Sequence, residues 1–339
     1  APTGIFRGKA NATLRTNILN SYSNKNREEN IRKLIPKLLE VGITTVNAME
    51  GGYMYSDKDA NFIYEHIADF PIDIVLFYQC LDLDKVREKK LKRIGGSLYI
   101  DGTMGARTAA LTFEYNDKPG EMGRLIFSQK ELNVFVEECY INKLQLSLYT
   151  IGDRAIETAL NAHEYALEKT GIKGLRHRME HVELASLSQI KRAKNLGIIF
   201  SMNPTYERYW GGPNKMYFER LGKRYVETNK FREIIDSGLT LCGGSDSDVC
   251  DYNPFVGIHS AVNHPVKKHR ISLYEAIKMY TINGAYAIFE ENNKGSLEIG
   301  KLADIIILDT DIFEINAESI DKVKVLCTIK SGKILYNTI

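Results

Sequence analysis

The chain has 339 residues, with 45 basic and 43 acidic side chains and a net charge of +2. This balance argues against nucleic-acid binding, which needs a clustered basic face. No apolar run approaches the roughly 18 residues that span a bilayer, so no membrane partner is expected either. The length suits an α/β barrel with a small appendage. A small-molecule ligand is the partner that remains.

Five cysteines occur, and no two have the CxxC spacing of a metal or redox motif. Cys80, Cys242 and Cys327 lie in apolar, strand-like runs, which predicts buried free thiols in a reducing compartment. No signal-peptide pattern is visible at the start of the chain. The expected location is therefore the cytoplasm.

Helix and strand patterns alternate along the chain. Apolar residues at helical spacing over 31–39 precede a strand at 43–48, and a helix at 59–70 precedes a strand at 72–78. A strand at 96–101 follows, then a helix to about 142 that starts with the capping box of Ser128 and Glu131. Further strands are predicted at 145–150, 177–181, 197–202 and 240–244, separated by helices at 153–167, 188–195 and 230–237. Asp153 is a candidate cap, and Ser272 with Glu275 caps a last helix through 280. Such alternation predicts a parallel sheet closed as a TIM-type barrel.

The tail follows a different pattern. Seven barrel-type strands are recognisable, whereas a closed barrel of this type has eight. Segments 303–309 and 323–336 read as three antiparallel strands, with the turn at Ser331-Gly332. We therefore predict a barrel over residues 1–298, short of one strand or using a substitute, and part of a small β-sandwich over 299–339.

Polar residues at the ends of these strands define a candidate site. His181 ends one strand and Asp246 follows another. Acidic groups at the C-terminal ends of barrel strands usually belong to the active site, so Asp246 is expected to face the pocket and act as a base. The rival interpretations are a hydrogen-bonded structural histidine and an Asx turn.

Three further residues are candidates for substrate contact. Tyr206 and Trp210 follow the strand at 197–202, where they would form an aromatic wall over the pocket. Arg107 lies in a loop after a strand, and its guanidinium suits a substrate carboxylate. Ordinary loop packing and structural salt bridges are the alternatives for these residues.

Several motifs in order resemble the amidohydrolase superfamily, specifically amidohydrolase family 3. The segments that carry the resemblance are 2–4, 41–46, 101–111, 151–155, 178–181, 244–246, 280–285 and 300–309. The resemblance implies a (β/α)₈ barrel with one or two divalent metals at its C-terminal rim, zinc being the expected ion. It also implies hydrolysis of a non-peptide C–N bond by a metal-activated water. Ligands in that family come from a His-x-His, a carboxylated Lys, two further His and an Asp.

The match to that ligand set is partial. His181 and Asp246 correspond to family ligands, and Asp246 would also transfer protons. Tyr149 stands where a ligand His is expected, and Ser97 where the carboxylated Lys is expected. No two of the seven histidines are two residues apart, so the His-x-His is absent, and the family's first strand is expected to be absent with it.

Two functions are therefore predicted. The first is an amidohydrolase-like enzyme with a degenerate or incomplete metal site. The second is a catalytically inactive barrel without metal, which binds a small molecule or forms part of a larger hydrolase. Tyr149 is a further candidate for substrate contact; it is expected to fill the emptied metal volume and to hydrogen-bond to Asp246, and a catalytic role is the alternative. A homodimer is expected only from the general frequency of twofold assemblies.

Overall fold

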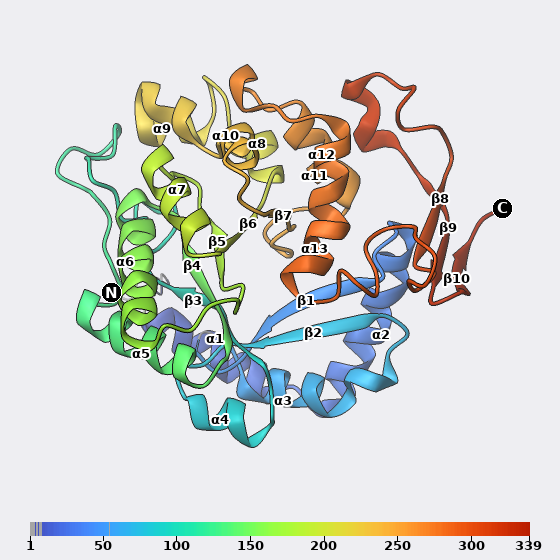
Figure 1. The fold of residues 1–339 in the computed structure, drawn as a ribbon, viewed down its shortest axis with the longest axis horizontal. Helices are drawn as coiled ribbons and strands as arrows, with labels where there is room; N and C mark the ends of the chain where they lie inside the picture. The colour runs from blue at the N-terminus through green and yellow to red at the C-terminus, as the bar shows by residue number, and fades with distance from the viewer. Residues whose placement is uncertain (1–3, 5, 7–8, 54) are drawn as a thin grey trace.

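The computed structural model describes residues 4, 6, 9–53 and 55–339, except for the side chains of Lys9 and Ser97. Pro2 and Thr3, in the first segment of the family resemblance, lie outside this range. The described chain forms two sheets (Figure 1). The strands of the larger sheet are β1 (Thr45–Glu50), β2 (Asp73–Tyr78), β3 (Arg93–Tyr99), β4 (Gln145–Thr150), β5 (Arg178–His181), β6 (Ile199–Met202) and β7 (Leu241–Gly243).

The larger sheet is wholly parallel, and its strands lie in sequence order from β1 to β7. All seven barrel-type strands predicted from the sequence are confirmed. The sheet curls as a TIM-type barrel does, but within the described residues β1 and β7 each pair on one side only (Figure 1). Parallel strands in sequence order bring all their C-terminal ends to one rim, which is where the candidate site residues gather.

Helices connect the strands and cover the outside of the sheet (Figure 1). The α-helices are α1 (Lys9–Ser21), α2 (Asn24–Glu40), α3 (Asp57–His66), α4 (Leu83–Glu88), α5 (Gln129–Ile141), α6 (Asp153–Thr170), α7 (Leu187–Asn195), α8 (Thr205–Trp210), α9 (Met216–Leu221), α10 (Phe231–Asp236), α11 (Pro254–Val262), α12 (Leu273–Tyr280) and α13 (Ile282–Ala287). Four 3₁₀ helices are η1 (Ile67–Asp69), η2 (Gly222–Glu227), η3 (Lys267–His269) and η4 (Ala317–Lys322).

Two of the three predicted helix caps are confirmed. Ser128 with Glu131 and Ser272 with Glu275 form capping boxes at the starts of α5 and α12. The prediction that Asp153 caps α6 is wrong, because Gly152 is the N-cap and Asp153 is the first helical residue. The carboxylate of Asp153 instead accepts a hydrogen bond from the backbone N–H of Thr112 at 2.9 Å.

Gly152 is required at this cap by packing. A Cβ atom there would lie 2.0 Å from the carbonyl oxygen of Ala110, far inside van der Waals contact. The β4–α6 turn therefore lies directly against the long loop that follows β3. This contact fixes the loop over the rim of the barrel.

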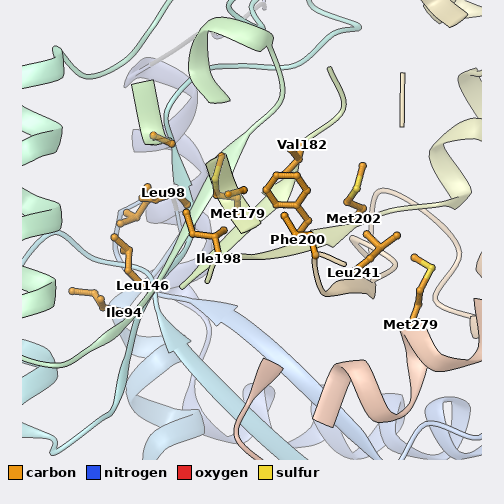
Figure 2. Close-up of a cluster of buried hydrophobic side chains, with 14 of the residues drawn as sticks. Ile94, Leu98, Leu146, Met179, Val182, Ile198, Phe200, Met202, Leu241 and Met279 are labelled. Carbon is orange, nitrogen blue, oxygen red and sulfur yellow. The ribbon is translucent and has the colours of Figure 1, made fainter. Parts of the chain in front are cut away.

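The main core lies between the sheet and its helices. Residues of β3 to β7 such as Ile94, Leu146 and Phe200 are fully buried, and Met279 of α12 packs in the same layer (Figure 2). Burying a side chain of this size stabilises the fold by about 1.5–3 kcal/mol. The core thus holds the strands rigidly and leaves the rim loops to carry the chemistry.

The smaller sheet has the antiparallel order β10-β9-β8, built from β8 (Ile305–Leu308), β9 (Val325–Lys330) and β10 (Lys333–Asn337). It confirms the three antiparallel strands predicted for the tail, including the turn at Ser331-Gly332. The sheet lies beside α2 (Figure 1), where the hydroxyl of Thr328 donates to the carbonyl of Leu39 at 2.7 Å. A domain boundary near residue 299 stays a prediction.

The five cysteines are free and buried, as predicted for Cys80, Cys242 and Cys327. Among the described residues, no helix combines the length and the apolar character that crossing a bilayer demands.

Candidate active site

The two strand ends singled out in the sequence lie at one rim and have unusual backbone geometry. His181 and Val182, at the end of β5, have φ angles of +69° and +47°, and Asp246, after β7, has φ of +54°. Left-handed conformations cost free energy in residues with a Cβ, most of all in a β-branched residue such as Val182. Strained backbone of this kind concentrates at functional sites, where it aims a side chain.

His181 is held in one orientation by a residue that sequence reasoning missed. Its Nδ1 lies 2.8 Å from the side-chain oxygen of Asn203, which directly follows β6. Because an amide oxygen only accepts, Nδ1 donates in this bond, and in the neutral ring the lone pair is then on Nε2. This is the tautomer in which a histidine can bind a metal or accept a proton through Nε2. A polar residue just beyond a strand end was the signal that could have identified Asn203.

Asp246 is half-buried, and its hydrogen-bond partner differs from the predicted one. The hydroxyl of Tyr206, on α8, donates to Oδ2 of Asp246 at 2.5 Å. Burial, together with the charge of Asp246, raises the pKa of Tyr206, so the phenol remains a donor. The expected bond from Tyr149 to Asp246 is absent among the described contacts, because the Tyr149 hydroxyl donates to the carbonyl of Gly102 at 3.4 Å.

Aromatic rings line the rim between His181 and Asp246. The ring of Tyr149 lies 4.1 Å from Tyr99 and 4.4 Å from His181, measured between centroids. On the other side, Tyr206 packs edge-on against Trp210 at 4.5 Å. Tyr149 and Tyr206 are almost fully buried, whereas Trp210 is partly exposed. The structure thus brings together four of the predicted site residues: Tyr149, His181, Tyr206 and Asp246, with Trp210 at the edge.

Arg107 contacts none of these residues in the described hydrogen bonds and ion pairs. Its guanidinium donates twice to Asp117, from Nε at 3.0 Å and from a terminal nitrogen at 2.6 Å, and Asp117 also pairs with Arg220. The salt-bridge alternative weighed for Arg107 is therefore the arrangement found. A substrate carboxylate would have to displace Asp117, so the predicted substrate contact finds no support in this geometry.

Ser97 lies in β3, the strand expected to supply the carboxylated Lys of the family. Its side chain lies outside the described residues. A serine hydroxyl cannot form the carbamate that bridges two metals, so the sequence-based argument against a binuclear site stands as a prediction.

Two carboxyl groups near the rim were missed by sequence reasoning, the buried Glu183 and the half-buried Glu50. Burial raises the pKa of Glu183 to about 8, although its bond from the Tyr217 hydroxyl at 2.6 Å acts in the opposite direction. Burial, with a smaller effect of Asp59, likewise raises the pKa of Glu50 to about 7. Glu50 ends β1 and Glu183 comes two residues after the end of β5, so their position at strand ends was the available signal.

The described residues do not by themselves fit a resident divalent metal. No group of three His, Cys, Asp or Glu side chains with suitable positions occurs among them. His181 and Asp246 suit a metal, but a catalytic zinc site uses three protein ligands. Burial also raises the pKa of Tyr149 well above its usual value, which makes a phenolate ligand unfavourable.

Comparison with known proteins gives the family. The family model described as the amidohydrolase family matches residues 1–336. A Bacillus subtilis protein named as an amidohydrolase, YtcJ, is 27% identical over 287 residues, covering 79% of this chain and 52% of that protein. The N-substituted formamide deformylase of Arthrobacter pascens is 24% identical over 360 residues, covering 99% of this chain and 65% of the enzyme.

A solved structure is similar throughout most of the chain. An uncharacterized metal-dependent hydrolase from Pyrococcus furiosus superposes with a TM-score of 0.75 at 28% identity. The superposition covers 87% of this chain and 63% of that protein. The chain thus spans between about half and two thirds of the length of these relatives. With a family model matched from residue 1 to residue 336, the chain belongs to the amidohydrolase family.

Proposed function

We propose that this chain forms the larger part of a hydrolase that cleaves a non-peptide C–N bond of a small molecule, with Asp246 as the group that transfers protons. The observation that carries the proposal is that the Asp246 carboxylate and an oriented His181 lie at the same C-terminal rim of a barrel, each held by a hydrogen bond. Family membership and the similarity to a formamide deformylase support the same reaction class.

In this proposal each residue has a defined task. Asp246 accepts a proton from the attacking water through a carboxylate oxygen and later donates it to the leaving nitrogen. The Tyr206 hydroxyl holds Oδ2 of Asp246 and leaves Oδ1 for the proton. Tyr149 and Tyr206, both buried, exclude bulk water from one side of the carboxylate, and His181 offers Nε2 to the reacting centre.

The test is hydrolysis of a panel of N-substituted formamides and amides by the protein and by Asp246→Asn. Loss of a positioned acid–base group costs about 10²–10⁴-fold in kcat, and we expect that loss with little change in KM. The matched control is Asp311→Asn, an exposed aspartate far along the chain in the tail. Unchanged hydrolysis by Asp246→Asn would contradict the assignment.

A second function is favoured by one observation, the absence of a three-ligand group among the described residues. In that case the chain is a metal-free barrel that binds a small molecule or needs a further segment to become active. Elemental analysis of protein purified without chelator, before and after zinc addition, separates the two. About one equivalent of zinc that is lost in His181→Ala supports the hydrolase, whereas no bound metal in either sample supports the binding function.

A further inference from the structure

A hollow of about 790 Å³ opens beside Asp246, and the reaction proposed above does not use it. It lies between α8 and the loop that joins β7 to α11. Three aromatic side chains line it, Tyr209, Trp210 and Tyr252. It is a shallow, open hollow, with aromatic side chains on both of the segments that form it.

The charged side chains that line this hollow are all acidic. Asp248 and Asp251 line it, and none of its described lining residues is Lys, Arg or His. Both aspartates are exposed, and neither has a described ion-pair partner. An aromatic surface next to unpaired carboxylates attracts a cation, because the negative faces of the rings and the carboxylates act in the same direction.

The hollow adjoins the loop that carries the proposed catalytic carboxylate, since Ser247, the residue after Asp246, lines it. Trp210 packs against Tyr206, and Tyr206 in turn donates to Asp246. Asp248 follows Asp246 by two residues in the same loop. Asp246 thus lies close to the lining of the hollow, with the Trp210 and Tyr206 rings on one side of it.

Elsewhere on this aromatic rim, a tyrosine ring already contacts a positively charged side chain of the protein. The guanidinium of Arg15, on α1, lies over the ring of Tyr55 at 4.9 Å from its centroid. Tyr55 is hydrogen-bonded to Tyr99, which packs on Tyr149. A continuous aromatic rim therefore accommodates a positive charge at one end, which is the behaviour expected of the hollow at the other.

We propose that this hollow binds the cationic group of the substrate, an alkylammonium or quaternary ammonium group, while the C–N bond to be cleaved reaches Asp246. The class of substrate is then a small amide or formamide that carries a positive charge a few bonds from the scissile nitrogen. This substrate assignment rests on the proposed hydrolase function, but the binding of a cation in the hollow does not.

The chain provides its own reporter for the test. Trp210 is the single tryptophan of the sequence and lines the hollow, so intrinsic tryptophan fluorescence reports on this part of the rim. The probes are choline and its neutral isostere 3,3-dimethyl-1-butanol, titrated into the full chain. We expect choline to bind about tenfold more tightly, since the two probes differ in charge and hardly in shape.

Substitutions of the two aspartates test whether choline binds in this hollow. The double variant Asp248→Asn/Asp251→Asn keeps the side-chain shapes and should weaken choline binding about fivefold, with the neutral alcohol unchanged. Asp311→Asn is the matched control, because Asp311 and Asp251 are both exposed and both accept a bond from the N–H two residues on. The comparison of two probes on the unmodified protein needs no variant, so a folding defect cannot obscure it.

The outcomes separate the two proposals. Equal binding of choline and the alcohol, or choline binding that is equally weakened by Asp311→Asn, would overturn the cation assignment. In that event hydrolysis of neutral formamides that is lost in Asp246→Asn would still support the proposed reaction. Selective choline binding without any hydrolysis would support the hollow and contradict the reaction.

Discussion

Glu180 and Glu183 lie three residues apart, both nearly buried, yet the protein treats them in opposite ways. Burial alone would raise the pKa of Glu180, but Arg178 and the hydroxyls of Ser147 and Ser201 outweigh it and the pKa is lowered. Burial raises the pKa of Glu183 to about 8, and the Tyr217 hydroxyl offsets only part of that. The contrast separates a charge-paired interior of the barrel from a rim where Glu183 has no described ion-pair partner.

The interior group is fully paired. Arg178 donates to both carboxylate oxygens of Glu180, at 2.8 and 3.0 Å, and also to Asn47 and Ser201. These residues come from β1, β5 and β6, so one guanidinium joins several strands of the sheet. The difference from Glu183 teaches that a nearby guanidinium, rather than burial, decides whether an acid here anchors structure or stores a proton.

Removing the positive charge of Arg178 should lower the free energy of unfolding more than any other change proposed here. We expect Arg178→Met to cost about 3–5 kcal/mol, because Glu180 would be left charged, buried and unpaired. Urea unfolding followed by circular dichroism measures it. The double variant Arg178→Met/Glu180→Met should recover part of the loss, since it removes the unpaired charge as well. A single variant that loses less than about 1 kcal/mol would remove the basis of the comparison.

Glu183 at the rim should make the stability of the protein depend on pH in the opposite direction to Glu180. A carboxyl group whose pKa is raised from 4.5 to about 8 contributes stability that is fully present below pH 4.5 and is lost as the pH rises to about 8. The advantage of the wild-type protein over Glu183→Gln should therefore shrink by on the order of 2–4 kcal/mol between pH 5 and 9. Melting temperatures across this range measure the difference.

Glu180→Gln is the matched variant for that measurement. Because the pKa of Glu180 is lowered in the folded protein, its contribution is present above pH 4.5 and is lost as the pH falls below it. The two variants should thus give opposite slopes against the wild-type protein. Parallel slopes would show that the two glutamates do not differ as argued.

The smallest expected effect belongs to the single hydrogen bond at Glu183. Tyr217→Phe removes the donor and leaves the ring in place, at a cost of about 1 kcal/mol. Since that bond lowers the pKa of Glu183, its loss should raise the pKa further and shift the pH dependence above to higher pH. Thermal unfolding of Tyr217→Phe at pH 7 and 9 tests both statements, and an unshifted profile would contradict the second.

Much of the fold could be predicted from sequence patterns within short segments. Each of the seven parallel strands, the three antiparallel strands of the tail and two capping boxes are features of a few adjacent residues. Local rules failed at Asp153, where the cap is decided by the close approach of Ala110 to Gly152. The short helices α8 and α13 escaped prediction because their six residues carry no distinct helical periodicity.

The sequence by itself determined the class of fold, the family and the two strand-end residues His181 and Asp246, since these depend on periodicity and on the order of motifs. Only the tertiary structure decided which side chains meet them. Tyr206 rather than Tyr149 holds Asp246, Asn203 orients His181, and Arg107 is occupied by Asp117. Hydrogen bonds between residues far apart in the chain depend on loop paths and side-chain packing, which no local pattern encodes.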